Sequence, residues 1–145
     1  GVDESVTFVG RVPNEQLPEL YTESTLFVLP SRNEGMPRTV LEALACETPA
    51  VTTQLPQLEA VLSDGGLTVS DPGPASLAAA VSELLGDENR RRAMGRAGRQ
   101  RVVTNHSWDR AVDETLEEYY TLLKNRSTKE RSNQRVTDLR WSLDQ

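Results

Sequence analysis

Short apolar runs alternate along the chain with longer stretches whose apolar residues recur every three or four positions. This alternation at short loop lengths predicts an α/β layered domain with a mainly parallel sheet. The apolar runs predict strands at Val6–Val9, Leu26–Leu29, Pro49–Thr52 and Leu67–Val69. The periodic stretches predict helices at Asn14–Tyr21, Pro37–Cys46 and Ser76–Leu85, one from Asp87 or Asn89 to Val103, and one from Trp108 to about Asn125.

The periodic pattern ends near Arg126, where Ser, Thr, Lys, Arg, Asn and Gln become the main residues. The sequence therefore predicts a folded domain over residues 1–126 and a polar, disordered tail over residues 127–145. A loosely docked helix in this tail stays open as an alternative. Its support is a set of apolar residues at Val136, Leu139, Trp141 and Leu143.

Composition narrows the classes of function. The 145 residues suffice for one domain with a core, and the formal net charge of -6 argues against general nucleic-acid binding. No apolar run approaches the roughly 20 residues of a membrane helix, and the first residues lack the layout of a signal peptide. A cytoplasmic protein is the resulting expectation. The single cysteine, Cys46, excludes an internal disulfide and is a buried structural thiol by this interpretation.

Arginines gather on one predicted helix, at Arg90–Arg92, Arg96, Arg99 and Arg101. Such a run is most often a solvated helix face. A peripheral contact with a membrane surface is the alternative that the run leaves open.

The stretch from Glu34 to Ala45 carries the candidate chemistry. It follows the apolar run Leu26–Leu29 and predicts a tight loop and then a helix. In open α/β sheets ligands bind beyond the carboxyl ends of the strands, where this loop would lie. Gly35 would allow close backbone approach, and the first N–H groups of the helix suit a diphosphate. Glu34 would accept hydrogen bonds from sugar hydroxyls.

Glu42 lies among the apolar residues of the same predicted helix. A carboxylate in such surroundings is costly unless hydrogen bonds satisfy it, and the two hydroxyls of a ribose would do so. Two plainer interpretations remain open from the residues alone. Arg38 and Glu42 are spaced for an ordinary surface ion pair, and Glu34 is placed to cap the helix.

The two glutamates, separated by seven residues within PSRNEGMPRTVLEALACETPAV, resemble the signature of retaining GT-B glycosyltransferases of family 4, the glycosyl transferases group 1. The resemblance extends from Val6 to about Leu123. It includes SVTFVGRV, LFVLPS, TPAVTT, the DPGPASLAAAVSELL helix and the final helix that HSW begins. It implies a Rossmann-like three-layer domain, the second half of a GT-B fold, with a C-terminal helix.

The resemblance also implies roles for individual residues. Glu34, Gly35, Met36 and Pro37 would bind the donor sugar, and Val40 and Leu41 would flank the diphosphate. Glu42 would bind the ribose, and Gly10 and Arg11 would line the nucleobase pocket. The implied reaction transfers a sugar from a nucleotide-diphosphate sugar to an acceptor with retention of anomeric configuration. The family needs no metal or other cofactor for it.

Three departures from the family pattern limit what the resemblance implies. Glu47 stands where the family often has glycine, which raises the question whether that turn needs a positive φ. Leu55–Glu59 replaces a loop that is commonly rich in glycine. The acceptor-binding domain, and the opening strand with an Arg and a Lys for the diphosphate, have no counterpart in these residues.

From the third departure we expect an N-terminally truncated, isolated chain without transferase activity. A separate acceptor-binding domain would be its natural partner. The alternative function is a non-catalytic remnant that pairs with a partner chain or with itself through an exposed sheet edge.

Overall fold

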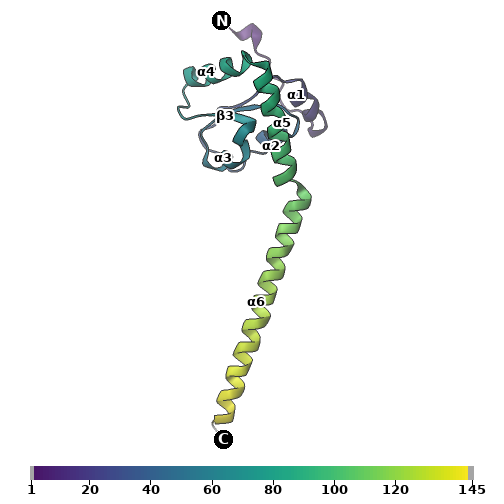
Figure 1. Ribbon diagram of the computed structural model, residues 1–145, viewed down its shortest axis with the longest axis vertical. Coiled ribbons are helices and arrows are strands. Elements are labelled where there is room, and N and C mark those ends of the chain that lie inside the picture. Colours follow the sequence, from purple (N-terminus) through teal and green to yellow (C-terminus); the bar gives the residue numbers. More distant parts are fainter. Residues whose placement is uncertain (1, 144–145) are drawn as a thin grey trace. The chain divides into compact units, whose positions relative to one another are not determined.

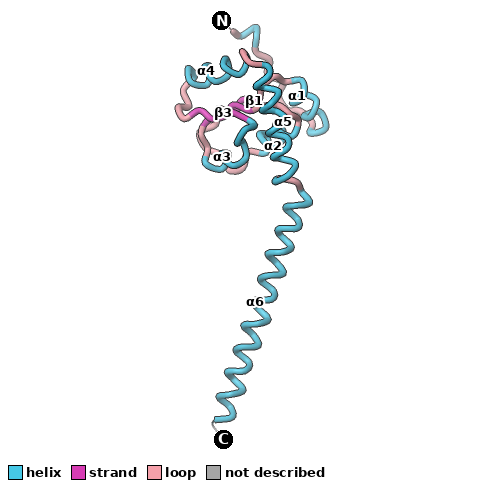
Figure 2. Tube along the Cα trace, in the orientation of Figure 1, coloured by secondary structure: helices cyan, strands magenta, loops and turns pink. Residues whose placement is uncertain are grey.

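The computed structural model describes the backbone of residues 2–143 and the side chains of residues 2–126. The chain divides into two compact units, Gly1–His106 and Ser107–Gln145. Figures 1 and 2 show a sheet with its helices in the first unit and one helix in the second. The elements of the first unit are α1 (Leu17–Glu23), β1 (Phe27–Leu29), α2 (Arg38–Ala45), β2 (Ala50–Thr53), α3 (Pro56–Leu62), β3 (Gly66–Val69), α4 (Pro74–Leu85) and α5 (Glu88–Asn105), with short 3-10 turns at Asp3–Ser5, Asn14–Gln16 and Ser63–Gly65.

The sheet has three parallel strands in the order β1-β2-β3. Val28 of β1 pairs with Val51 of β2, which pairs in turn with Leu67 of β3. All four residues of β2 are buried, as expected for a central parallel strand that is covered on both faces. These three strands and the helices α2, α4 and α5 confirm the predicted α/β fold.

Two apolar clusters make the core, one on each face of β2. Ala50 belongs to a cluster with residues of α2 and α3, while Val51 belongs to a cluster with Leu84 of α4. The long helix α5 contributes to both, through Val102 to the first and Met94 to the second. Because successive strand residues point to opposite faces, the two clusters define a three-layer arrangement.

Helix α3 is an element that the sequence patterns missed. It begins at Pro56, where a missing N–H costs least, and it buries Leu58, Val61 and Leu62. These residues lie at the i, i+3 and i+4 positions of an amphipathic helix, so the signal was present but short. The segment that departs from the glycine-rich family loop is therefore part of the core.

The predicted strand at Val6–Val9 was wrong. No backbone hydrogen bond joins residues 7–9 to another segment of the described chain, and Phe8 is 94% exposed. A β-rich sequence becomes a strand only when a neighbour satisfies its N–H and C=O groups. Among the described strands β1 pairs with β2 alone, and Val6–Val9 adds nothing to that edge.

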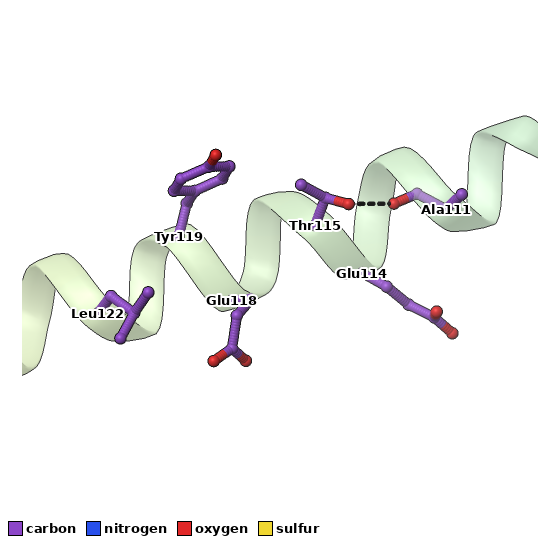
Figure 3. A pocket seen from close by; sticks show the side chains of 6 residues that line it. All are labelled: Ala111, Glu114, Thr115, Glu118, Tyr119 and Leu122. Atoms are coloured by element: carbon purple, nitrogen blue, oxygen red, sulfur yellow. Dashed lines mark hydrogen bonds between the residues drawn. The ribbon is translucent and has the colours of Figure 1, made fainter.

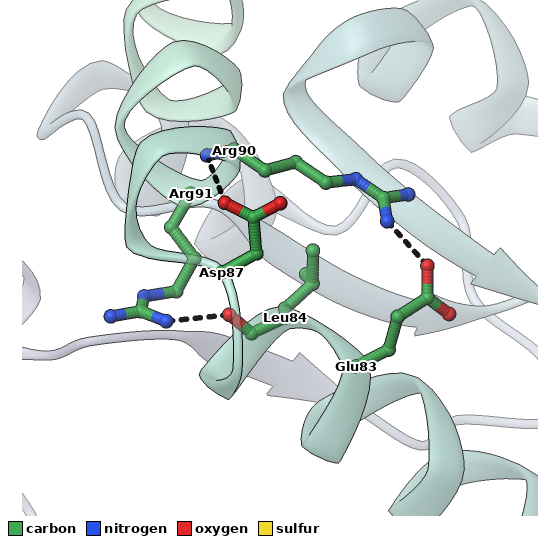
Figure 4. Close-up of polar contacts among 5 residues, drawn as sticks. All are labelled: Glu83, Leu84, Asp87, Arg90 and Arg91. Atoms are coloured by element: carbon green, nitrogen blue, oxygen red, sulfur yellow. Dashed lines mark hydrogen bonds and ion pairs between the residues drawn. The ribbon is translucent and has the colours of Figure 1, made fainter.

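Four of the six arginines of α5, namely Arg90, Arg92, Arg96 and Arg99, are exposed, in agreement with the predicted solvated face. Several of the six also bond other parts of the fold. The Arg91 guanidinium donates to the Leu84 carbonyl oxygen at 2.6 Å (Figure 4). It also donates to the Leu85 carbonyl oxygen at 2.6 Å, and both acceptors lie at the end of α4. Arg99 donates to the Ala45 carbonyl at the end of α2, and Arg101 to the Ala60 carbonyl in α3. The last carbonyls of a helix lack internal partners, so these guanidinium groups tie three helices to α5.

Asp87 starts α5, which decides between the two predicted N-terminal residues. Its Oδ1 accepts a hydrogen bond from the Arg90 N–H at 2.9 Å, while the Arg90 side chain pairs with Glu83 of α4 (Figure 4). Arg92 forms a further i,i+4 pair with Glu88. The charges of the α5 run are thus largely used within the fold.

The turn between α2 and β2 answers the question that Glu47 raised. Its φ is +62°, so this turn does need the left-handed conformation and a non-glycine residue adopts it. The turn lies against α5 so closely that a Cβ at Gly95 would come within 2.0 Å of the Glu47 carbonyl oxygen. Gly95 is therefore required by packing.

The second unit is the helix α6 (Trp108–Leu143), which begins where the sequence predicted and extends past the predicted end near Asn125. Ser107 accepts a hydrogen bond from the Arg110 N–H at 3.3 Å, as expected for a cap. A shallow hollow on its surface is lined by Ala111, Glu114, Thr115, Glu118, Tyr119 and Leu122 (Figure 3). The boundary predicted at residue 126 stays a prediction. Within residues 2–143 no helix is long and apolar enough to span a bilayer.

Candidate functional site

The loop from Pro30 to Pro37 joins the carboxyl end of β1 to α2. Ser31 donates to Glu34 Oε1 at 2.6 Å, so the carboxylate is held within the loop. Thr53, at the end of β2, donates to the Ser31 carbonyl, and Gln57 of α3 donates to the Glu34 carbonyl at 2.5 Å. The loop is therefore anchored to β2 and α3 at the edge where the parallel strands end.

A pocket of about 330 Å³ lies beside this loop. It is lined by residues that follow all three strands, namely Ser31, Arg32, Thr53, Gln54, Ser70 and Pro72. The Arg32 guanidinium has no hydrogen bond or ion pair among the described side chains. The carboxyl edge thus presents hydroxyl, amide and guanidinium donors around one opening, a set suited to a hydroxylated or anionic ligand.

The start of α2 has free backbone donors. Pro37 is the N-cap residue, no side chain caps the helix, and its first turn has no acidic residue. Glu34 therefore does not cap α2, which sets aside one of the two plainer interpretations. The uncapped N–H groups and the positive end of the helix dipole favour an anion here.

Gly35 and Met36 are exposed, and Pro37 is buried. The φ of Gly35 lies outside the left-handed region, and a Cβ there would meet nothing within 4 Å. The fold therefore does not itself require glycine at this position. Open space above the backbone remains compatible with the close approach of a ligand.

Glu42 is half-buried on α2, and a hydroxyl partner satisfies one of its oxygens. Tyr21 of α1 donates to Glu42 Oε2 at 3.1 Å. Burial and the hydrogen bond to Glu42 raise the pKa of Tyr21 to about 12. Within residues 2–126 no ion pair joins Arg38 to Glu42, so the second plainer interpretation is not seen either.

The remaining predicted residues differ in how they are placed. The Val40 side chain is fully buried in the core and its N–H donates to the Pro37 carbonyl at 3.1 Å, whereas Leu41 is half-buried. Gly10 has a φ of +72° and precedes the exposed Arg11. No hydrogen bond or ion pair connects either of them to the loop after β1 among the described residues.

Sequence patterns identified Glu34 and Glu42 but not the groups that hold them. In the sequence Tyr21 was visible only as the last residue of a predicted helix, and Ser31 and Gln57 were visible only as loop residues. Tyr21 lies 21 positions from Glu42, a contact that no local pattern reports. No cluster of three or more potential metal ligands occurs in the described part of the chain.

A parallel sheet covered by helices on both faces, with a glutamate-bearing loop before α2, defines a Rossmann-like α/β domain. The family described as "Glycosyl transferases group 1" matches residues 1–101, and this chain belongs to that family.

Individual relatives agree with this assignment. The chain is 36% identical over 121 residues to the D-inositol 3-phosphate glycosyltransferase of Salinispora tropica, a match that covers 82% of this chain and 25% of that protein. It is 35% identical over 116 residues to the alpha-maltose-1-phosphate synthase of Mycolicibacterium smegmatis, covering 74% of this chain and 30% of that protein.

The fold has a solved counterpart in the sucrose-phosphate synthase of Thermosynechococcus elongatus. The TM-score is 0.77 at 29% identity, and the match covers 84% of this chain and 31% of that structure. The chain therefore has the fold of one part of a GT-B glycosyltransferase. It spans about a quarter to a third of the length of these relatives.

Proposed function

We propose that this chain is the donor-binding part of a retaining glycosyltransferase and binds a nucleotide-diphosphate sugar at the carboxyl edge of its sheet. The observation that carries the proposal is Glu42. It is a half-buried carboxylate that the fold satisfies with one neutral hydroxyl and with no cation among the described residues. Family membership supports a nucleotide-sugar donor.

In this proposal Glu42 accepts hydrogen bonds from the ribose hydroxyls of the nucleotide. The diphosphate lies at the uncapped N-terminus of α2, beside Val40 and Leu41. Gly10 and Arg11 contact the nucleobase, as the family resemblance implies.

Glu34 receives the donor sugar. Its Oε1 already accepts from Ser31, so its Oε2 is the oxygen that would accept from a sugar hydroxyl. The backbone of Gly35, Met36 and Pro37 would pass close to the sugar. The tie from Gln57 to the Glu34 carbonyl keeps this part of the loop in place.

The chemical contribution of these residues is electrostatic. When the sugar leaves, negative charge develops on the diphosphate, and aligned N–H donors stabilise it without reorganising. An acceptor-binding domain would complete the cleft and supply the attacking hydroxyl. We expect this chain alone to bind the donor without transferring its sugar. Three relatives have a sugar or polyol phosphate in their names, so such a phosphate is the first acceptor to test with the completed enzyme.

Calorimetric titration of the folded chain with UDP, GDP and ADP tests the proposal. One of the three should bind with a Kd of about 1 mM or below, and Glu42→Ala should weaken it about tenfold or more. Glu59→Ala, which removes an exposed glutamate of α3, is the matched control and should bind as the unaltered chain does. A folded sample that binds none of the three would reduce the family membership to ancestry alone.

A non-catalytic interaction module is the second candidate, and exposed apolar surface favours it. Val6, Phe8 and Val9 lie exposed beside no strand, and α6 exposes Trp108 and Tyr119. Patches of this kind mark interaction surfaces in many proteins. Sedimentation velocity distinguishes the two: a monomer at all concentrations speaks against self-association, and a dimer without nucleotide binding favours the module.

A further inference from the structure

Tyr21 joins three elements around the candidate ribose site. Its ring packs edge-on against Phe27 of β1, with ring centroids 5.9 Å apart and planes at 70°. Its hydroxyl donates to Glu42 Oε2 of α2 at 3.1 Å. Its carbonyl accepts from the buried Thr48 hydroxyl at 2.6 Å, in the turn that follows α2. Ring, hydroxyl and backbone of this residue are therefore each held by a separate contact.

The Tyr21 hydroxyl contacts a carboxylate that would otherwise have several orientations open to it. A glutamate side chain has three rotatable bonds, and a half-buried one on a helix can place its carboxylate in several directions. Among the described residues, the Tyr21 hydroxyl is the side chain that bonds the Glu42 carboxylate. With Oε2 engaged, Oε1 stays available to accept hydrogen bonds from a ligand.

The chemistry of the two groups suits a tyrosine that orients the carboxylate and a glutamate that binds the ligand. A phenol is a neutral donor, so it orients the carboxylate without neutralising it, unlike the guanidinium groups of α5. Burial first, and then the hydrogen bond to Glu42, raise the pKa of Tyr21 to about 12. The hydroxyl therefore remains a donor throughout the neutral range.

We propose that Tyr21 is a positioning residue that holds Glu42 Oε2, so that Oε1 faces the ribose hydroxyls of a bound nucleotide. The inference rests on the proposed function, because it assigns Tyr21 a role through Glu42 in the same site. It predicts that the Tyr21 hydroxyl contributes to the recognition of ribose and to no other part of the nucleotide.

Tyr21→Phe tests the role, since phenylalanine keeps the ring against Phe27 and removes only the hydroxyl. The ligands are whichever of UDP, GDP and ADP binds the unaltered chain, and the 2′,3′-dideoxy form of the same diphosphate. The measured quantity is the ratio of the two Kd values on one sample, which does not depend on the folded fraction. Tyr120→Phe, at an exposed tyrosine of α6, is the matched control.

The unaltered chain and Tyr120→Phe should prefer the ribonucleotide. In Tyr21→Phe this preference should fall about three- to tenfold, which corresponds to the usual cost of ordering one free side chain. The Kd of the dideoxy compound should stay the same. An equal loss for both ligands would show a general structural effect and overturn the inference, as would an unchanged preference.

Glu42→Ala separates this failure from a failure of the proposed function. If Glu42→Ala loses the ribose preference while Tyr21→Phe keeps it, the donor site stands and the positioning role falls. If the unaltered chain binds the ribonucleotide and the dideoxy form equally, Glu42 does not read ribose and both proposals fail.

Discussion

Two charged regions of this domain are built on opposite principles. On α5, the guanidinium groups of Arg91, Arg99 and Arg101 donate to helix carbonyls, and the fold uses them as ties. In the loop after β1 and on α2, the carboxylates of Glu34 and Glu42 are held by neutral hydroxyls alone among the described side chains. A charge that a neutral group positions stays available to a ligand, whereas one that caps a helix does not. The density of charge on α5 is therefore a poorer guide to function than two glutamates with seven residues between them.

Replacing a glycine with alanine should have the largest effect, and this effect should differ between the two regions. Gly95→Ala places a Cβ within 2.0 Å of the Glu47 carbonyl oxygen, so α5 must move away from the turn. We expect the free energy of unfolding to fall by about 2–4 kcal/mol, in the range of severe overpacking. Urea unfolding followed by circular dichroism measures it.

Gly35→Ala is the counterpart at the site and its control. A Cβ at Gly35 meets nothing within 4 Å, so stability should change by less than about 0.5 kcal/mol. If the donor sugar approaches this backbone, nucleotide-sugar binding should weaken in the same variant. A large loss of stability in Gly35→Ala, or none in Gly95→Ala, would contradict the contrast.

Loss of one α5 tie should have the next largest effect. Arg91→Met removes the donor to the Leu84 and Leu85 carbonyls while keeping much of the side-chain length. We expect a loss of about 1–2 kcal/mol in the free energy of unfolding, with the Kd for the nucleotide diphosphate unchanged. Arg96→Met is the control, because Arg96 is exposed and has no partner among the described side chains. If nucleotide binding weakens in Arg91→Met but not in Arg96→Met, α5 takes part in nucleotide binding and is not only a structural helix.

Replacing Glu47 with glycine, in the turn between α2 and β2, should stabilise the protein. Glu47→Gly removes the cost of a φ of +62° in a residue with a Cβ, so we expect a gain of about 0.5–1 kcal/mol in the free energy of unfolding. The contact that is lost, between Glu47 and Arg99 at 3.9 Å, joins two half-exposed groups and contributes little. Glu59→Gly, in the exposed face of α3, should instead cost about 1 kcal/mol. Destabilisation by Glu47→Gly would mean that the ion pair matters more than the backbone.

The local part of this structure could be read from the sequence, and the long-range part could not. The runs around Val28, Val51 and Val69 predicted the three strands because each is a short segment of apolar and β-branched residues. Val6–Val9 has an equally good pattern and is no strand, since pairing depends on a neighbour that local sequence does not contain.

The site divides in the same way. Glu34 and Glu42 were visible through their spacing before and within one helix. Their partners Ser31 and Tyr21 were not, because a hydroxyl that bonds a carboxylate has the same sequence appearance as one that faces water. The exposure of the α5 arginines was predicted, but the carbonyl acceptors of Arg99 and Arg101 were not, because these lie far away in the chain.

A charge removed at the edge of the sheet should change binding and leave stability alone. Arg38→Gln removes a cation at the first position of α2, next to the proposed diphosphate. We expect a two- to fivefold weaker Kd for the nucleotide diphosphate at low salt, about 0.5–1 kcal/mol, and a smaller difference at high salt. Arg96→Gln makes the same change in net charge on α5 and should not alter the Kd. Equal losses in both variants would point to a general effect of net charge, not to a local one.

Stability should also depend on alkaline pH through Tyr21. Its pKa is raised to about 12 from the ordinary value of 10, chiefly by burial and by the Glu42 carboxylate. Between pH 10 and 12 the unfolded tyrosine loses its proton while the folded one keeps it, so the folded state binds more protons and stability falls as pH rises. Relative to Tyr21→Phe, the unaltered chain should therefore lose free energy of unfolding between pH 10 and 12 and show no such difference below pH 9. Urea unfolding of both proteins at pH 8.5 and pH 11 measures this, since every other titrating group is common to the pair. If the difference in free energy of unfolding between the two proteins is the same at pH 8.5 and pH 11, the Tyr21 hydroxyl faces water in the folded protein. Glu42 would then lack the neutral partner that distinguishes its region from α5.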